Sequence, residues 1–116
     1  IYLLHKFSEF SDKDDIMNAA RNLINLHSEQ LDFELQKYLG DILSDNLEKE
    51  DFIVFGDSIL NIYPFKGLLY SLVRTYEEVG LRQQALDKVK TWLKKDPQDE
   101  DIKLLHEYLL EMNSFQ

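Results

Sequence analysis

The feature that most constrains the fold of this chain is an apolar pattern that recurs every 33 residues. Residues 85–93 align with residues 52–60 and, one period earlier, with residues 19–27. The aligned sets are Ala85, Leu86, Val89, Trp92 and Leu93; Phe52, Ile53, Gly56, Ile59 and Leu60; and Ala19, Ala20, Leu23, Leu26 and His27. Pro97 likewise aligns with Pro64. A fixed period of this length is typical of stacked helical hairpins and favours binding over catalysis.

Length and composition are consistent with one helical domain over residues 1–116. Apolar residues make up 44% of the chain, which argues against disorder, and four glycines and two prolines suit helices better than a turn-rich β fold. No apolar run approaches the length needed to span a bilayer, so membrane insertion is not expected. The chain begins at Ile1 without an initiator Met, which suggests a fragment of a larger protein.

The charge balance narrows the classes of partner. The net charge of −9 disfavours nucleic acids and anionic membranes, and it favours apolar or basic protein partners. The absence of cysteine excludes disulfides, thiolate catalysis and cysteine-based zinc sites, and it leaves the compartment open.

Helical spacing of apolar residues dominates the whole chain and predicts seven helices. They are expected at about 1–10, 13–27, 29–44, 47–62, 65–79, 82–95 and 97–112. Because the connections are short, neighbouring helices should be antiparallel. The predicted fold is therefore an all-α, antiparallel helix-hairpin array, or α-solenoid.

Capping residues define several predicted helix starts, because their side-chain oxygens accept hydrogen bonds from otherwise unpaired amides of the first turn. Ser11 or Asp12 should cap the helix over 13–27, and Ser28 should cap the one over 29–44. Asp45 and Glu48 resemble a capping box for the helix over 47–62.

Glycine and proline positions predict further boundaries. Gly56 is unfavourable inside a helix, which suggests that a neighbouring helix passes close to it. Pro64 should end one helix and start the next, and Gly80 should end its helix in a left-handed conformation. Asp96 should cap the last helix, with Pro97 at its first position.

Residues 66–99 resemble a tetratricopeptide repeat (TPR), a 34-residue unit of two antiparallel helices. The matching positions are Leu69, Leu72, Tyr76, Gly80, Ala85, Val89, Leu93, Asp96 and Pro97. Val73 and Trp92 depart from the small residues that the family prefers at those positions. More degenerate units are expected over 1–32 and 33–65, with a C-terminal capping helix over 97–112.

The resemblance implies a concave partner-binding face formed by the first helix of each pair. The residues that it places there are Glu34, Lys37, Asp41, Tyr70, Arg74, Glu77, Glu78 and Lys103, with Ser44 and Gly67 beside them. Asp41 stands where one subtype of the family needs Asn to grip a terminal carboxylate. The acidic excess of this face instead favours an apolar or basic peptide, or a partner helix.

No set of residues points to catalysis, to a cofactor or to a metal. His5, His27 and His106 are isolated from one another, and the carboxylates form runs at predicted helix starts, where the helix dipole favours them. An aromatic cluster is expected mostly in the core, although some of its members could line a binding surface: Phe52, Phe55, Tyr63, Phe65 and Tyr70.

The sequence therefore favours a non-catalytic scaffold or adaptor that binds a protein or peptide. Two alternatives remain open. The first is a regulatory or sensor domain that docks on a neighbouring catalytic or DNA-binding domain. The second is a self-association module that forms a homo-oligomer through its terminal helices.

Overall fold

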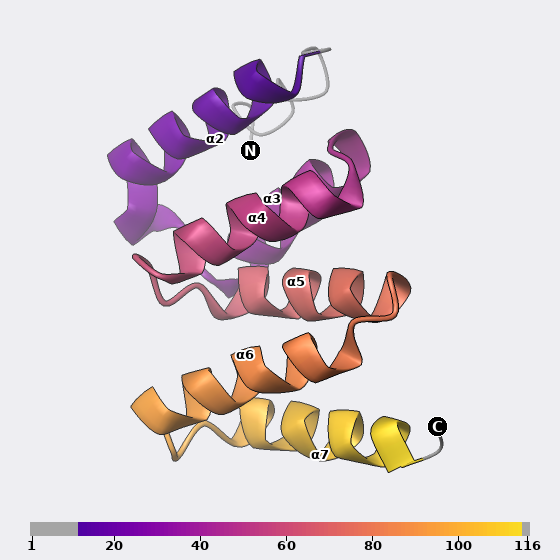
Figure 1. The fold of residues 1–116 in the computed structure, drawn as a ribbon. Coiled ribbons are helices and arrows are strands. Elements are labelled where there is room, and N and C mark those ends of the chain that lie inside the picture. Colours follow the sequence, from indigo (N-terminus) through magenta and orange to yellow (C-terminus); the bar gives the residue numbers. More distant parts are fainter. Residues whose placement is uncertain (1–11, 115–116) are drawn as a thin grey trace. The chain divides into compact units, whose positions relative to one another are not determined.

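The computed structural model describes residues 12–114, which form helices and no strand (Figure 1). The helices are α2 (Lys13–His27), the 3₁₀ helix η2 (Ser28–Gln30), α3 (Phe33–Asn46), α4 (Lys49–Leu60), α5 (Lys66–Glu78), α6 (Arg82–Lys95) and α7 (Glu100–Ser114). The predicted all-α array is thus confirmed, and the helix expected over 1–10 lies outside the described residues. Two compact units, Ile1–Thr75 and Tyr76–Gln116, divide the chain, and each is considered by itself.

In the first unit, α2 and α4 run parallel although α3 separates them in sequence. At their N-terminal ends, Lys13 forms an ion pair of 3.5 Å with Asp51. At their C-terminal ends, the Tyr63 hydroxyl just beyond α4 donates a hydrogen bond of 3.0 Å to the side-chain oxygen of Asn25. Because α2 and α4 are parallel and short connections join each of them to α3, α3 runs antiparallel to both, as predicted.

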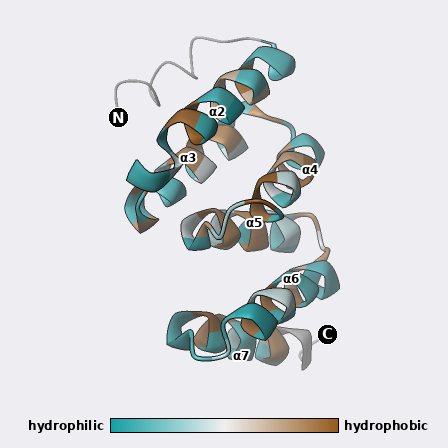
Figure 2. Ribbon diagram, turned by 90° about the vertical axis from the view of Figure 1, so that its left-hand side faces the viewer, coloured by the Kyte–Doolittle hydropathy of each residue, from teal (hydrophilic) through white to brown (hydrophobic). Residues whose placement is uncertain are grey.

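The core of the first unit consists of one apolar stripe from each helix (Figure 2). Its buried apolar residues include Ile16, Ala20, Ile24, Leu39, Leu43, Phe52, Phe55, Ile59, Leu68, Leu69, Leu72 and Val73. The predicted close approach at Gly56 is confirmed, because a Cβ there would lie 3.2 Å from Leu72 Cδ1. Leu26 was expected inside and is 77% exposed, because it points away from the stripe of Ile16, Ala20 and Ile24.

Two predicted caps in the first half of the chain have different outcomes. Asp12 caps α2 by accepting a hydrogen bond of 2.8 Å from the amide of Asp14. Ser28 does not cap the next helix, because the 3₁₀ turn over Ser28–Gln30 ends at an extended Leu31. The helix expected at 29 therefore begins at Phe33, and the side chain of Asp32 caps it by accepting from the amide of Leu35.

The capping box expected at Asp45 and Glu48 is wrong. Asp45 lies in the last turn of α3, which continues to Asn46. Glu48 precedes α4 and makes no side-chain capping bond. The connection has the predicted length of two residues but lies two residues later, at 47–48, because the amide of buried Leu47 donates a hydrogen bond to the carbonyl of Leu43 and extends the last turn of α3.

Pro64 lies in the connection between α4 and α5, outside both helices. After α4 ends at Leu60, the chain turns through residues 61–65, and the amide of Phe65 donates to the carbonyl of Tyr63 on the other side of Pro64. The Tyr63 and Phe65 rings stack with their centroids 5.1 Å apart. The proline thus separates α4 from α5, but α5 begins two residues later, at Lys66.

The second unit contains the end of α5 followed by α6 and α7, which pack against each other. Its buried apolar residues are Tyr76, Ala85, Leu86, Val89, Ile102 and Leu109. Gly80 has a φ of 79°, which confirms the predicted left-handed stop. The amides of Gly80 and Leu81 donate to the carbonyls of Glu77 and Tyr76, so the end of α5 is closed by a Schellman motif.

The start of α7 differs from the prediction. Asp96 and Pro97 lie in a turn in which the amide of Asp99 donates to the carbonyl of Asp96, and α7 begins at Glu100. Asp99 is the capping residue, because its Oδ1 accepts from the amide of Ile102 at 3.3 Å. Its Oδ2 accepts from the indole Nε1 of Trp92 at 3.0 Å, and this tertiary bond places the cap three residues later than expected.

Candidate partner-binding face

The predicted binding residues of the first unit lie where α3 and α5 pack side by side. An added Cβ at Gly67 would lie 2.7 Å from the Cβ of Gln36 and 2.7 Å from the amide nitrogen of Lys37. One Cβ at Gly40 would lie 2.7 Å from the Cβ of Ser71. The two helices are parallel, and glycine on each of them allows their backbones to approach closely.

Gln36 connects the two helices through both ends of its amide. The side-chain nitrogen donates a hydrogen bond of 2.8 Å to the carbonyl of Leu31, and the side-chain oxygen accepts one of 2.9 Å from the amide of Gly67. Gly67 lies in the first turn of α5, where amides lack partners within the helix. The buried side chain of Gln36 in α3 therefore caps the N-terminal end of α5.

Next to the contact between Gln36 and Gly67, an aromatic side chain of α3 packs against one of α5. The rings of Phe33 and Tyr70 are 5.7 Å apart between centroids and lie edge to face. The Lys37 ammonium is 5.6 Å from the centroid of the Phe33 ring, which is within cation–π range. Phe33 is 38% exposed and Tyr70 is half-buried, so part of this aromatic surface faces solvent.

Further along α3 and α5, toward their C-terminal ends, the contact between the helices is made by charged side chains. Arg74 of α5 donates a hydrogen bond of 3.1 Å to Oδ1 of Asp41 in α3. Both side chains are about half exposed, so this ion pair contributes little to stability but fixes the position of both groups. We call the surface of Phe33, Glu34, Lys37, Asp41, Tyr70 and Arg74 the α3–α5 face.

The structure brings five of the eight predicted binding residues onto this face: Glu34, Lys37, Asp41, Tyr70 and Arg74. The other three belong to the second unit. Glu77 and Glu78 lie in the last turn of α5, and Lys103 in α7 forms an ion pair of 3.3 Å with Glu100 of its own helix.

Sequence reasoning missed one member of the face and misplaced another. Phe33 was not singled out, although it precedes Lys37 and Asp41 by one and two helical turns and so shares their side of α3. Gly67 was expected on the face and instead is buried against the backbone of α3, where a Cβ would lie 2.5 Å from the carbonyl oxygen of Phe33. Most of the aromatic cluster is core, as expected, since Phe52, Phe55 and Phe65 are buried.

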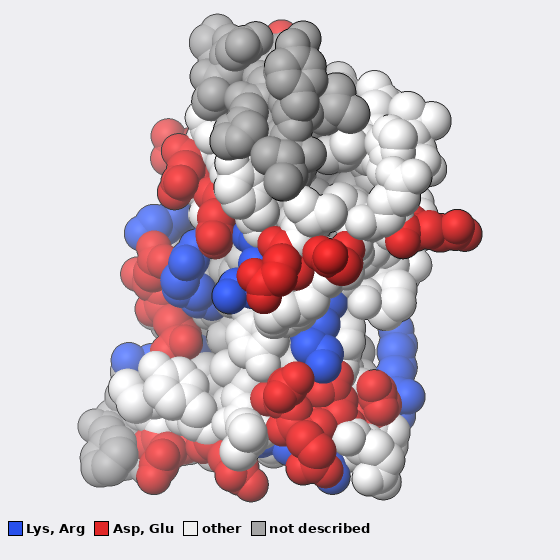
Figure 3. Space-filling view, turned by 180° about the vertical axis from the view of Figure 1, so that it is seen from behind, with Lys and Arg blue, Asp and Glu red and all other residues white. Residues whose placement is uncertain are grey.

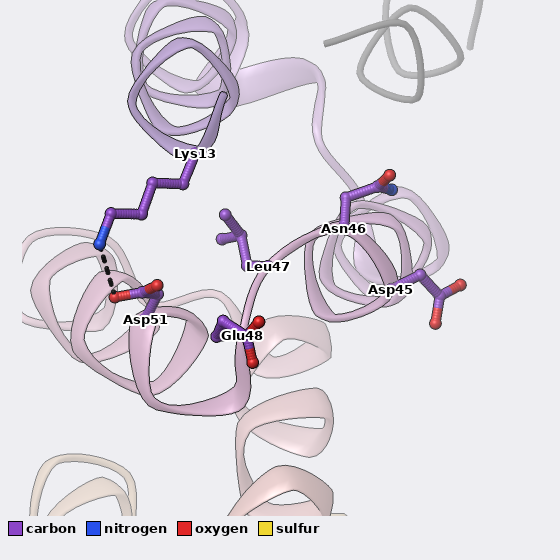
Figure 4. Close-up of a pocket in the computed structure, with 6 residues that line it drawn as sticks. All are labelled: Lys13, Asp45, Asn46, Leu47, Glu48 and Asp51. Atoms are coloured by element: carbon purple, nitrogen blue, oxygen red, sulfur yellow. Dashed lines mark ion pairs between the residues drawn. The ribbon is translucent and has the colours of Figure 1, made fainter. Parts of the chain in front are cut away.

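Other places in the described residues offer less definite geometry. Figure 4 shows an open hollow of about 410 Å³ beside the α3–α4 connection, lined by Lys13, Asp45, Asn46, Leu47, Glu48 and Asp51. Among residues 12–114, no group of three or more potential ligating side chains is arranged to hold a metal ion. No helix of this part of the chain has the length and apolar character that a membrane span requires.

On the face seen in Figure 3, carboxylates and cations of the described residues are interspersed rather than gathered into one basic area. The Nδ1 of His27 lies 3.0 Å from the side-chain oxygen of Gln30, within hydrogen-bond distance. Comparison with family models, with curated proteins and with solved structures gave no match to this chain.

Proposed function

We propose that this chain is a TPR-like, non-catalytic interaction module that binds an apolar or basic peptide, or a partner helix, on the α3–α5 face. The repeat period supports this proposal, because the contacts between α3 and α5 join residues separated by about one period. Asp41 and Arg74 are 33 residues apart, and Gln36 and Gly67 are 31 apart. Packing between equivalent helices of successive hairpins is what a stacked array requires.

The observation that carries the binding proposal is the part-exposed aromatic pair of Phe33 and Tyr70, with charged groups around it. Aromatic side chains provide much of the binding energy at protein interfaces when a partner covers them. Glu34 and Asp41 offer carboxylates for a basic partner residue, while Lys37 and Arg74 already interact with Phe33 and Asp41. A peptide with an apolar anchor and a flanking cation would satisfy both features.

The test uses peptides selected from a displayed random library against the intact chain, with affinities then measured for variants. Tyr70→Ala and Glu34→Lys should weaken the selected peptides by about tenfold, which corresponds to about 1.4 kcal/mol. Asp87→Lys on the exposed side of α6 is the matched control and should leave affinity unchanged. Equal losses in Glu34→Lys and Asp87→Lys would place binding elsewhere and contradict the proposal.

A further inference from the structure

A second apolar surface lies on α7, away from the core of its unit. Leu104 is 64% exposed and Tyr108 is 46% exposed, and they are one helical turn apart on the same side of the helix. The buried side of α7 is different and is formed by Ile102 and Leu109. Two large apolar side chains on one exposed helix face are a feature of interaction surfaces.

The residues of α5 that lie one sequence period before Leu104 and Tyr108 have a different environment. One period earlier, Leu104 and Tyr108 correspond to Ser71 and Thr75 of α5. Those two small polar residues are buried, and Ser71 lies against Gly40 of α3. The position that a neighbouring helix covers in α5 is therefore open in α7, where it carries larger and more apolar side chains.

The charges around this surface specify its occupant. Asp101, Glu107 and Glu111 are exposed on the same side of α7 as Leu104 and Tyr108, so the border of this surface is acidic. A second copy placed face to face would bring these carboxylates together, which is unfavourable. The exposed side of α6 offers a copy no apolar match, since its residues are polar or charged: Gln83, Gln84, Asp87, Lys90, Thr91, Lys94 and Lys95.

We propose that the α7 surface of Leu104 and Tyr108, bordered by Asp101, Glu107 and Glu111, binds a basic amphipathic helix of a partner protein. The apolar side of that helix would cover Leu104 and Tyr108, and its Lys or Arg residues would meet the surrounding carboxylates. This surface is separate from the α3–α5 face and does not depend on it.

The experiment measures binding of a labelled amphipathic helical peptide of Leu and Lys to the intact chain, with a Leu and Glu peptide of the same pattern for comparison. The Leu/Lys peptide should bind more tightly, with amide shift changes in NMR spectra concentrated on α7. Leu104→Ser with Tyr108→Ser should weaken it by about tenfold or more. Leu26→Ser with Val54→Ser, at exposed apolar positions of the first unit, should have no effect.

Several outcomes would overturn the proposal. These are equal binding of the two peptides, equal losses in the two double variants, or shift changes outside α7. A dimer in solution that Leu104→Ser abolishes would mean that a second copy covers the surface. A large fall in the midpoint of thermal unfolding of the Leu104→Ser variant, measured without peptide, would mean that the free chain already buries the α7 surface. Tyr70→Ala should leave this peptide's affinity unchanged, which distinguishes failure here from failure of the α3–α5 face.

Discussion

Arg74 Nη2 and Asp41 Oδ1 lie 3.1 Å apart, although the two residues are separated by 33 positions, one full period of the sequence repeat. The pair shows that α5 is placed against α3 at equivalent positions of two successive hairpins. Around it, the structure combines a close backbone contact at Gly67 with a part-exposed aromatic pair. Residues that pack α3 against α5 and residues that are part-exposed beside them therefore alternate along the same two helices, and the two groups can be tested separately.

The contact at Gly67 should be intolerant of a methyl group. Because a Cβ there would meet backbone atoms of Phe33 and Lys37, Gly67→Ala should lower the free energy of unfolding by about 2–3 kcal/mol. Gly56→Ala is the matched control, since its Cβ would meet side-chain atoms of Leu72 at 3.2 Å rather than backbone, and about 1 kcal/mol of helix propensity would offset the tighter packing. Urea denaturation followed by circular dichroism measures both. Equal stability of the two variants would contradict the close approach of α3 and α5.

The buried amide of Gln36 should be essential for stability. Gln36→Leu would leave the carbonyl of Leu31 and the amide of Gly67 without partners, at a cost of about 2–4 kcal/mol. Gln30→Leu removes an exposed side-chain bond to His27 and should change the free energy of unfolding by less than about 0.5 kcal/mol. Thermal unfolding distinguishes the two, and a Gln36→Leu variant as stable as the parent would exclude this capping role.

The second unit offers a prediction with its own spectroscopic signal. Asp99→Ala removes both the cap of α7 and the acceptor of the Trp92 indole, so it should destabilise the chain by about 2 kcal/mol. Trp92 is the single tryptophan, and its emission should shift when the hydrogen bond is lost. Asp96→Ala in the same connection keeps both bonds and should leave emission unchanged. A Trp92 spectrum insensitive to Asp99→Ala would argue against the bond.

The ion pair of the α3–α5 face allows binding to be separated from folding. Arg74→Glu should change the free energy of unfolding by no more than about 1 kcal/mol, because both side chains are half exposed. The exchanged variant Asp41→Arg with Arg74→Asp should recover any loss of stability while presenting reversed charges to a partner. Affinity for a basic peptide selected on the parent chain should therefore fall in the exchanged variant, which replaces the Asp41 carboxylate by a cation, whereas Arg74→Glu adds negative charge and should not weaken that peptide. Unchanged affinity in the exchanged variant would show that the pair does not contact the peptide.

The sequence predicted correctly those helix bounds that depend on interactions between residues close together in the chain. The α2 and α6 bounds, Lys13–His27 and Arg82–Lys95, agree with the predicted ranges, because apolar periodicity and the Asp12 cap act within a few residues. Gly80 was recognisable because a left-handed residue at a helix end favours glycine. The period of 33 residues also equals the separation of Asp41 and Arg74, which pair between α3 and α5.

The remaining features depended on side chains from distant parts of the chain. Gln36 caps α5 across 31 residues, and Trp92 helps to make Asp99, rather than Asp96, the cap of α7. By itself, the sequence determined an all-helical chain, and its resemblance to a repeat family predicted five of the residues that lie on the α3–α5 face. Only the tertiary structure decided that Gly67 is buried, that Phe33 joins the face and that Leu104 and Tyr108 of α7 are exposed. Helical periodicity fixes which residues share a side of a helix, whereas burial depends on which other helix lies against that side.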